Sequence, residues 1–204
     1  FILPTLCDTA AVYGPCAPSF GQRPRHESLD DAFNLLCGLK NTVFNYPLWE
    51  IQDPETDNPY EPYNVTEPFN MKVVAKDDTE RASFSGRLLG GCLDCLSILC
   101  GTRFDAVGTF NENYKNDGVI WFLEACDLTP MGIHRALWQL DNAGWFERAS
   151  GFIIGRPYMY GADGMGYDRG HHIRGDADAD IRVPSAVIPY PLQFLFCMGV
   201  WMRR

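Results

Sequence analysis

The sequence has no run of lysine or arginine, and its 17 basic residues are outnumbered by 26 acidic ones, for a net charge of −9. Nucleic acids and anionic membrane surfaces bind clustered positive charge, so we predict neither as a partner. No apolar stretch approaches the roughly 20 residues of a membrane-spanning helix, and no leader pattern follows Phe1. We therefore expect a soluble protein whose partners are peptides or small molecules.

Recognisable nucleophile and metal motifs are also missing. No serine stands in a Gly-x-Ser-x-Gly turn. The stretch Cys92-Leu93-Asp94-Cys95 offers zinc or redox ligands, but no second cysteine pair completes a set of four. The eight cysteines are scattered through apolar segments, so we predict buried free thiols in a reducing compartment. The sequence thus predicts no metal and no cofactor.

The second half of the chain alternates strand and helix patterns. Apolar runs of strand length are followed by helical spacing, and Thr129 with Pro130 is typical of a helix start that Gly144 ends. The expected strands are residues 84–88, 118–123 and 151–155, and the expected helices are residues 92–99 and 130–143. This alternation predicts an α/β domain with a largely parallel sheet.

The first half is less regular. Ser28 is a plausible N-cap for a helix over residues 29–37. Residues 40–76 are rich in proline and cannot hold a continuous helix, so they predict a linker or covering loop. Trp49 is one of its aromatic residues, which either line a cleft or, in the simpler interpretation, pack on a domain surface.

Glu124 is the most informative single residue. It follows a six-residue apolar strand, and ligands of open α/β sheets gather at the carboxyl ends of strands. There it could orient a histidine that deprotonates a serine, although composition alone favours an acid that solvates a strand end. Gly90 and Gly91 permit a tight turn whose N–H groups could hold a substrate carboxylate, but their spacing is not that of a phosphate loop.

None of the four histidines is an obvious catalytic base. His134 falls inside the helix capped by Thr129 and is most simply a packing or surface residue. His171 and His172 lie on a polar loop and are candidates for a base or a ligand, but adjacent histidines on such a loop are usually solvated. We assign no role to them or to His26.

These segments, in this order, resemble the LD-carboxypeptidase family, which includes murein tetrapeptide carboxypeptidases and microcin C immunity proteins. The matching stretches are residues 13–15, 86–93 with 101–102, 121–124, 135–140 with Gly144, and 151–157. Each stretch is unspecific alone, but their combination is specific.

The resemblance implies a cytoplasmic, metal-free serine carboxypeptidase, usually a homodimer, that uses a Ser-Glu-His triad to cleave an amide bond next to a free carboxylate. Its substrate would be a murein L,D-tetrapeptide, cut to tripeptide and D-alanine in peptidoglycan recycling, or a peptidyl-nucleotide antibiotic in microcin immunity. Glu124 matches the family's catalytic glutamate. Gly90, Gly91 and Trp49 are then expected to bind substrate.

The resemblance also implies how the chain is divided. Residues 1–39 would be the tail end of an N-terminal α/β, flavodoxin-like domain, 40–83 a proline-rich linker, 84–168 the C-terminal α/β domain and 169–204 a divergent tail.

Two catalytic residues of the family are expected to be missing. The family's serine lies upstream of the segment that matches residues 1–13, and no histidine stands near residues 190–194, where the family has a Gly-His pair. We suspect a change of reading frame near Arg169. The chain is therefore expected to be inactive alone, and the alternatives are a degenerate peptide-binding module or a fragment without function.

Overall fold

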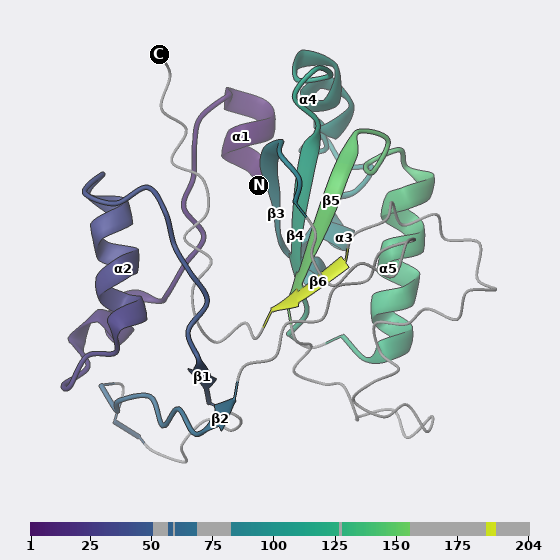
Figure 1. Cartoon of the computed structure of the whole chain (residues 1–204). Helices are drawn as coiled ribbons and strands as arrows, with labels where there is room; N and C mark the ends of the chain where they lie inside the picture. The colour runs from purple at the N-terminus through teal and green to yellow at the C-terminus, as the bar shows by residue number, and fades with distance from the viewer. Residues whose placement is uncertain (51–56, 59, 69–82, 127, 156–186, 191–204) are drawn as a thin grey trace. The chain divides into compact units, whose positions relative to one another are not determined.

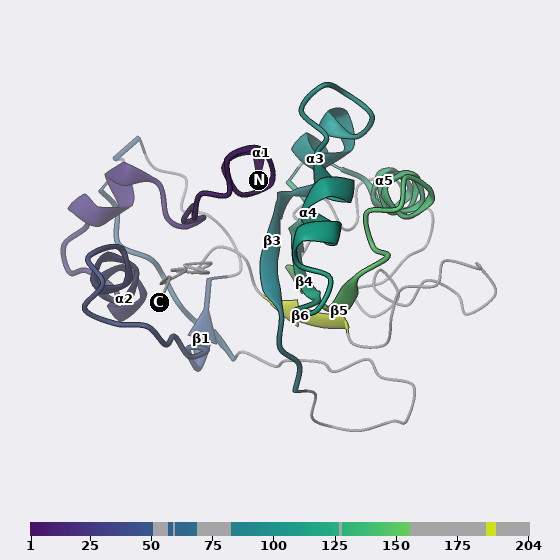
Figure 2. The same cartoon turned by 90° about the horizontal axis from the view of Figure 1, so that it is seen from above.

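The computed structural model of the chain is shown in Figure 1 and, turned by 90°, in Figure 2. It describes residues 1–50, 57–58, 60–68, 83–126 and 128–155, and the backbone of residues 187–190. The chain divides into two compact units, one of Phe1–Thr9 with Met71–Tyr190 and one of Ala10–Asn70 with Pro191–Arg204. The first nine residues thus group with the second half of the sequence, whereas the sequence analysis placed them with residues 10–39.

The first unit is built on a four-stranded parallel sheet, ordered β3-β4-β5-β6, which confirms the predicted α/β class. Helices α3 and α4 connect β3 to β4, helix α5 connects β4 to β5, and α3 and α5 lie side by side in both views (Figures 1 and 2). The elements are α1 (Ile2–Cys7), β3 (Arg87–Cys92), α3 (Leu93–Leu99), α4 (Val107–Asn113), β4 (Val119–Glu124), α5 (Pro130–Asn142), β5 (Ala149–Gly155) and β6 (Val187–Tyr190).

The local signals that predicted α5 act as expected. The Thr129 hydroxyl accepts a hydrogen bond from the Gly132 amide at 3.2 Å, and Pro130 occupies the first turn, where its missing N–H costs nothing. Gly144 follows the helix with a φ of 80°, a conformation that glycine adopts without strain. Cap, proline and glycine together fix both ends of this helix.

Aromatic packing fills the core of the first unit. Trp121 of β4 stacks on Trp145 with ring centroids 5.7 Å apart and meets Phe146 edge-on at 5.2 Å. Phe146 in turn meets Phe152 of β5 at 5.1 Å. All four side chains are buried, and each contributes on the order of 2 to 3 kcal/mol by leaving water. The core thereby fixes β4 and β5 relative to the helices.

Alternation along β4 separates its side chains onto two faces. Val119, Trp121 and Leu123 belong to the core cluster. Ile120 and Phe122 are also buried but lie on the opposite face, and Glu124 follows them in the alternation. The carboxylate therefore leaves the sheet on the face away from the aromatic core.

The second unit contains α2 (Glu27–Leu36), the 3₁₀ helix Ala17–Gly21, and the short antiparallel pair β1 (Leu48–Trp49) and β2 (Glu67–Pro68). Helix α2 confirms the helix predicted for residues 29–37, but it begins two residues earlier because His26, not Ser28, caps it. The described parts of residues 40–76 hold no helix, in agreement with their proline content.

Two short helices were not predicted. Neither α1 nor α4 has a side-chain hydrogen bond at its N-cap, so the sequence gives no start signal. Helix α1 is held by tertiary contacts instead, because the ring of Phe1 stacks on Trp145 with centroids 4.9 Å apart and Tyr114, the residue after α4, donates a hydrogen bond to Asp8. No helix of the described residues is long and apolar enough to cross a membrane.

The cysteine prediction needs a correction. No disulfide joins the seven cysteines that the structure describes, as expected, but these side chains are not buried. Five are exposed and Cys92 and Cys100 are half-buried, whereas Cys197 lies outside the described residues. Several cysteines occur at helix ends, where an apolar sequence context does not guarantee burial.

Gly90 is the glycine whose replacement should cost most. Its φ is 154°, and a Cβ atom there would overlap the carbonyl oxygen of Phe122 on β4. We expect Gly90→Ala to lower the free energy of unfolding by roughly 3 kcal/mol, measured by urea titration with tryptophan fluorescence. Gly108→Ala is the control, because a Cβ in α4 meets nothing within 4 Å and alanine favours a helix by about 0.5 to 1 kcal/mol. Equal stability of the two variants would contradict the close approach of the strands.

Candidate functional site

The carboxyl ends of β3 and β4 form the candidate site. Cys92 is the last residue of β3 and Glu124 the last residue of β4, and their Cα atoms are partners in the parallel register. Both side chains are half-buried. The structure thus places Glu124 at the sheet edge that the sequence predicted and sets a thiol beside it.

Asp94 and Cys126 complete this cluster. The Cys92 sulfur lies 3.3 Å from Asp94 Oδ2, and the Cys126 backbone N–H donates to the same oxygen at 3.2 Å. The Cys92 thiol donates to Asp94, and the nearby Glu124 carboxylate raises the pKa of the same thiol. Two carboxylates and one thiol therefore share the edge of the sheet.

The environment keeps this thiol protonated. Burial is the largest cause that raises the pKa of Cys92, and the carboxylates of Glu124 and Asp94 raise it further, to about 12. Because the thiolate is the form that attacks electrophiles and binds metals, Cys92 is suited to neither role near neutral pH. No group of three or more potential metal ligands occurs among the described residues, and Cys95 is exposed and free. The zinc and redox interpretations of residues 92–95 therefore gain no support.

Gly90 and Gly91 lie inside β3, not in a turn after it. Strand β3 covers Arg87–Cys92, several residues later than the predicted strand 84–88, and α3 begins directly at Leu93. Position 90 requires glycine because β4 approaches so closely that a side chain would overlap the Phe122 carbonyl. The predicted strand ended too early because glycine ordinarily weakens a strand. A contact of either glycine with substrate stays a prediction.

Trp49 belongs to the second unit. Its indole N–H donates to the Pro68 carbonyl at 3.3 Å, which joins β1 to β2. The neighbouring Glu50 is buried and accepts a hydrogen bond from the Asn64 amide at 3.1 Å. These contacts agree with the packing alternative for Trp49, and its substrate role remains a prediction.

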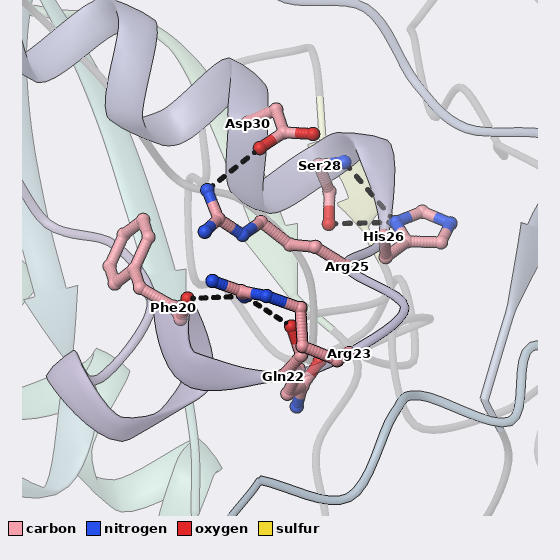
Figure 3. Close-up of polar contacts among 7 residues, drawn as sticks. All are labelled: Phe20, Gln22, Arg23, Arg25, His26, Ser28 and Asp30. Carbon is pink, nitrogen blue, oxygen red and sulfur yellow. Dashed lines mark hydrogen bonds and ion pairs between the residues drawn. The ribbon is translucent and has the colours of Figure 1, made fainter.

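A serine–histidine contact occurs in that unit and is structural (Figure 3). His26 Nδ1 lies 2.8 Å from the Ser28 hydroxyl and also accepts from the Ser28 amide at 3.2 Å. Ser28 is fully buried, so no substrate reaches its hydroxyl. The imidazole caps α2, a role that sequence reasoning gave to Ser28. His134 lies in α5, as predicted, and His171 and His172 lie outside the described residues.

The His26 cap should make the second unit sensitive to pH. Burial lowers the pKa of His26, with Glu27 opposing, and only the neutral ring can accept from the Ser28 amide. A lowered folded-state pKa means that the stabilisation is present above the unfolded value of 6.5 and is lost as the pH falls through the folded value. We expect the urea midpoint, followed by tryptophan fluorescence, to fall between about pH 7.5 and about pH 5.

His26→Asn is the matched variant for this prediction, because asparagine retains a cap acceptor but does not titrate. Its midpoint should be nearly constant over the same pH range. An equal pH dependence in both proteins would assign the effect to other groups.

Sequence reasoning found Glu124 but missed its neighbours. Cys92, Asp94 and Cys126 were considered only as parts of a possible metal motif or as buried thiols. Their position in the sequence could have indicated them. The stretches Cys92-x-Asp94 and Glu124-x-Cys126 each stand at the end of an apolar strand, and the carboxyl ends of neighbouring parallel strands lie close together. Which strands are neighbours, however, was known only from the structure.

Comparison with known proteins identifies a family model that matches part of the chain. The model of the LD-carboxypeptidase C-terminal domain matches residues 85–184, a range that extends past the residue 168 predicted for this domain. No curated protein matches the chain significantly.

Solved structures of similar fold include the microcin C7 self immunity protein MccF in complex with glutamyl sulfamoyl guanosine. The chain is 16% identical to it, with a TM-score of 0.61 and coverage of 93% of this chain and 54% of that one. An MccF-like protein from Streptococcus pneumoniae in complex with AMP is 18% identical, with a TM-score of 0.51 and coverage of 81% and 49%. At these identities the likeness shows the fold, and the chain spans about half the length of these proteins. The family match covers β3, β4, β5 and Glu124, and this part of the chain is an LD-carboxypeptidase C-terminal domain.

Proposed function

We propose that this chain is part of a serine carboxypeptidase of the LD-carboxypeptidase type, which hydrolyses an amide bond next to a free carboxylate. The observation that carries the proposal is the position of Glu124 at the carboxyl end of a buried parallel strand, within the segment that matches the family's C-terminal domain. Family membership alone would not select this residue. Its place at the sheet edge gives it access to a ligand and to a catalytic histidine.

Glu124 would act as the orienting acid of the triad. A carboxylate that accepts the N–H of an imidazole fixes the ring and stabilises its charged form. The other ring nitrogen then takes the serine proton as Oγ attacks the carbonyl carbon, and it gives that proton to the leaving amine. Water hydrolyses the resulting acyl-enzyme by the same transfers. Gly90, Gly91 and Trp49 are the residues we propose for substrate binding.

The serine and histidine of this mechanism are not assigned on the chain. Among the described residues, the serine–histidine contact that the structure gives is Ser28 with His26, and it is buried in the second unit. The Ser97 hydroxyl also has a structural partner, because it donates a hydrogen bond to the Asp94 carbonyl at 2.9 Å within α3. We therefore propose that the 204-residue chain does not hydrolyse substrate by itself.

Two substrate classes fit a carboxypeptidase of this family. One is a murein L,D-tetrapeptide, which would be cut to tripeptide and D-alanine in peptidoglycan recycling. The other is a peptidyl-nucleotide antibiotic, and solved MccF complexes with glutamyl sulfamoyl guanosine and aspartyl sulfamoyl adenosine support this class. We propose that the intact protein works in the cytoplasm as a homodimer, without a metal.

The activity can be tested directly with the purified chain and a murein tetrapeptide. We expect no D-alanine release above the uncatalysed background, measured by a coupled D-amino-acid oxidase assay. Should release occur, Glu124→Gln is expected to lower kcat by on the order of 10³-fold or more, as removal of a triad member does, and Glu112→Gln, an exposed acid of α4, should not change it. Turnover that survives Glu124→Gln would refute the proposed role of Glu124.

The alternative is a peptide-binding module without chemistry, or a fragment without function. The raised pKa of Cys92 favours the binding module over a thiol enzyme. The thiol beside Glu124 stays protonated at neutral pH and is therefore a poor nucleophile.

Calorimetric titration with glutamyl sulfamoyl guanosine and with tetrapeptide separates these alternatives. If the chain is a binding module, the titration should give measurable heat. Trp49→Ala should then raise the Kd about tenfold, because an aromatic contact with ligand contributes roughly 1 to 2 kcal/mol. Trp138→Ala, at an exposed position of α5, is the control and should bind as the wild type does. The absence of heat with both ligands would refute the binding module.

A further inference from the structure

Helix α5 carries a large aromatic side chain on its solvent face. Trp138 is 58% exposed, although tryptophan is ordinarily among the more buried residues. The opposite face of the helix is anchored, because Ala136 and Leu140 are buried in the core of the first unit. The tryptophan ring therefore takes no part in attaching α5 to its own domain and is available to a partner.

Helix α3 extends this apolar surface. The Gln139 side-chain amide donates to the Ser97 carbonyl at 3.5 Å, and both views show α3 beside α5 (Figures 1 and 2). Next to this contact lie Trp138 on α5 and Ile98 on α3, whose side chain is 75% exposed. Exposed apolar side chains that gather on one surface are typical of protein interfaces, in which tryptophan and arginine are enriched.

Charges of opposite sign flank Trp138. Arg135 stands three residues before it and Asp141 three residues after it, and residues at this spacing are neighbours on a helix surface. Among the residues that the structure describes, neither of these charged side chains has an ion-pair partner. We call Arg135, Trp138 and Asp141 the α5 face. It is positive at one end, negative at the other and apolar in the middle.

This pattern of charge is complementary to itself. When two copies of α5 pack antiparallel about a two-fold axis at Trp138, residues equally far before and after the tryptophan come level with each other. Arg135 of each copy then lies level with Asp141 of the other, whereas a parallel pair would bring like charges together. The chain has a net charge of −9, so two copies repel one another in general. A face on which the two signs balance is where they can meet.

We propose that the α5 face is a self-association surface, on which two copies of the chain pack antiparallel with their Trp138 rings in contact at the two-fold axis. The 13 residues of α5 span about 20 Å. Contact of one such helix with its copy buries less than the roughly 800 Å² per partner of a typical stable interface, so the dimer is weak, with a Kd on the order of 10 µM.

The first test measures the mass of the full chain in solution. Sedimentation velocity at low salt, from about 1 µM to about 200 µM, brackets the expected Kd and should show the wild type passing from monomer to dimer. Trp138→Ser should remain a monomer. Phe44→Ser is the matched control, because it removes another exposed aromatic ring, and it should dimerise as the wild type does. A monomeric wild type would overturn the proposal, and so would equal weakening by the two substitutions.

The second test changes the charges and leaves Trp138 in place. Arg135→Glu sets two acids level with each other and Asp141→Arg sets two bases, so each should raise the Kd roughly tenfold or more. The double variant restores opposite signs and should return the Kd toward the wild-type value. Glu112→Arg, at an exposed position of α4, is the control, because it changes the net charge as Asp141→Arg does and should not raise the Kd.

Two outcomes of the charge test would overturn the antiparallel pairing. One is a Kd that neither single substitution changes, because the charges would then lie outside the contact or face their own kind. The other is a double variant that binds as weakly as the single variants, because exchanged charges should attract as the original ones do.

The pairing through α5 does not rest on the proposed hydrolysis. Trp138 lies in the middle of α5, whereas Glu124 lies at the end of β4. If the chain dimerises with a Kd that neither Trp138→Ser nor the charge variants change, the α5 face is wrong and the homodimer proposed for the intact protein stands. If Glu124 proves not to be catalytic, the proposed function fails and the pairing through α5 is unaffected.

Discussion

The close parallel pairing of β3 with β4 is the constraint on which the candidate site depends. At Gly90 the strands approach so closely that the Phe122 carbonyl occupies the space of a side chain. This approach continues in register to the strand ends and makes Cys92 the partner of Glu124. The aromatic core packs against β4 through Trp121, on the face of the sheet opposite to Glu124. The glutamate is thus placed by backbone packing.

Electrostatics at this edge favour a carboxylate with a neutral donor beside it. Two acids and a half-buried thiol would repel one another if all three were ionised, and the thiol is the group that remains protonated. The same arrangement makes Cys92 a poor nucleophile, which distinguishes this edge from that of a thiol enzyme. Such a site can accept an N–H group and orient it, which is the part that the third member of a catalytic triad performs.

Several elements could be predicted from local signals, and others could not. Helix α5 was predicted because Thr129, Pro130 and Gly144 mark its ends, and β4 because a six-residue apolar run is buried on both faces. Helix α1 has no cap and is held by the stacking of Phe1 on Trp145, a contact between residues far apart in sequence. Ser28 was taken as the cap of α2 because serine is a common N-cap residue, whereas the ring of His26 does this.

The sequence by itself determined the α/β class, the position of Glu124 after a buried strand and the resemblance to LD-carboxypeptidases, because these depend on local periodicity and on the order of short motifs. Only the tertiary structure decided that Gly90 serves strand packing, that Ser28 is inaccessible, and that Cys92 and Asp94 stand beside Glu124. The burial of Ser28 depends on what packs around α2, and the other two facts depend on which strands are neighbours and in what register. Residues more than thirty positions apart meet through the sheet, and no local pattern in the sequence encodes that meeting.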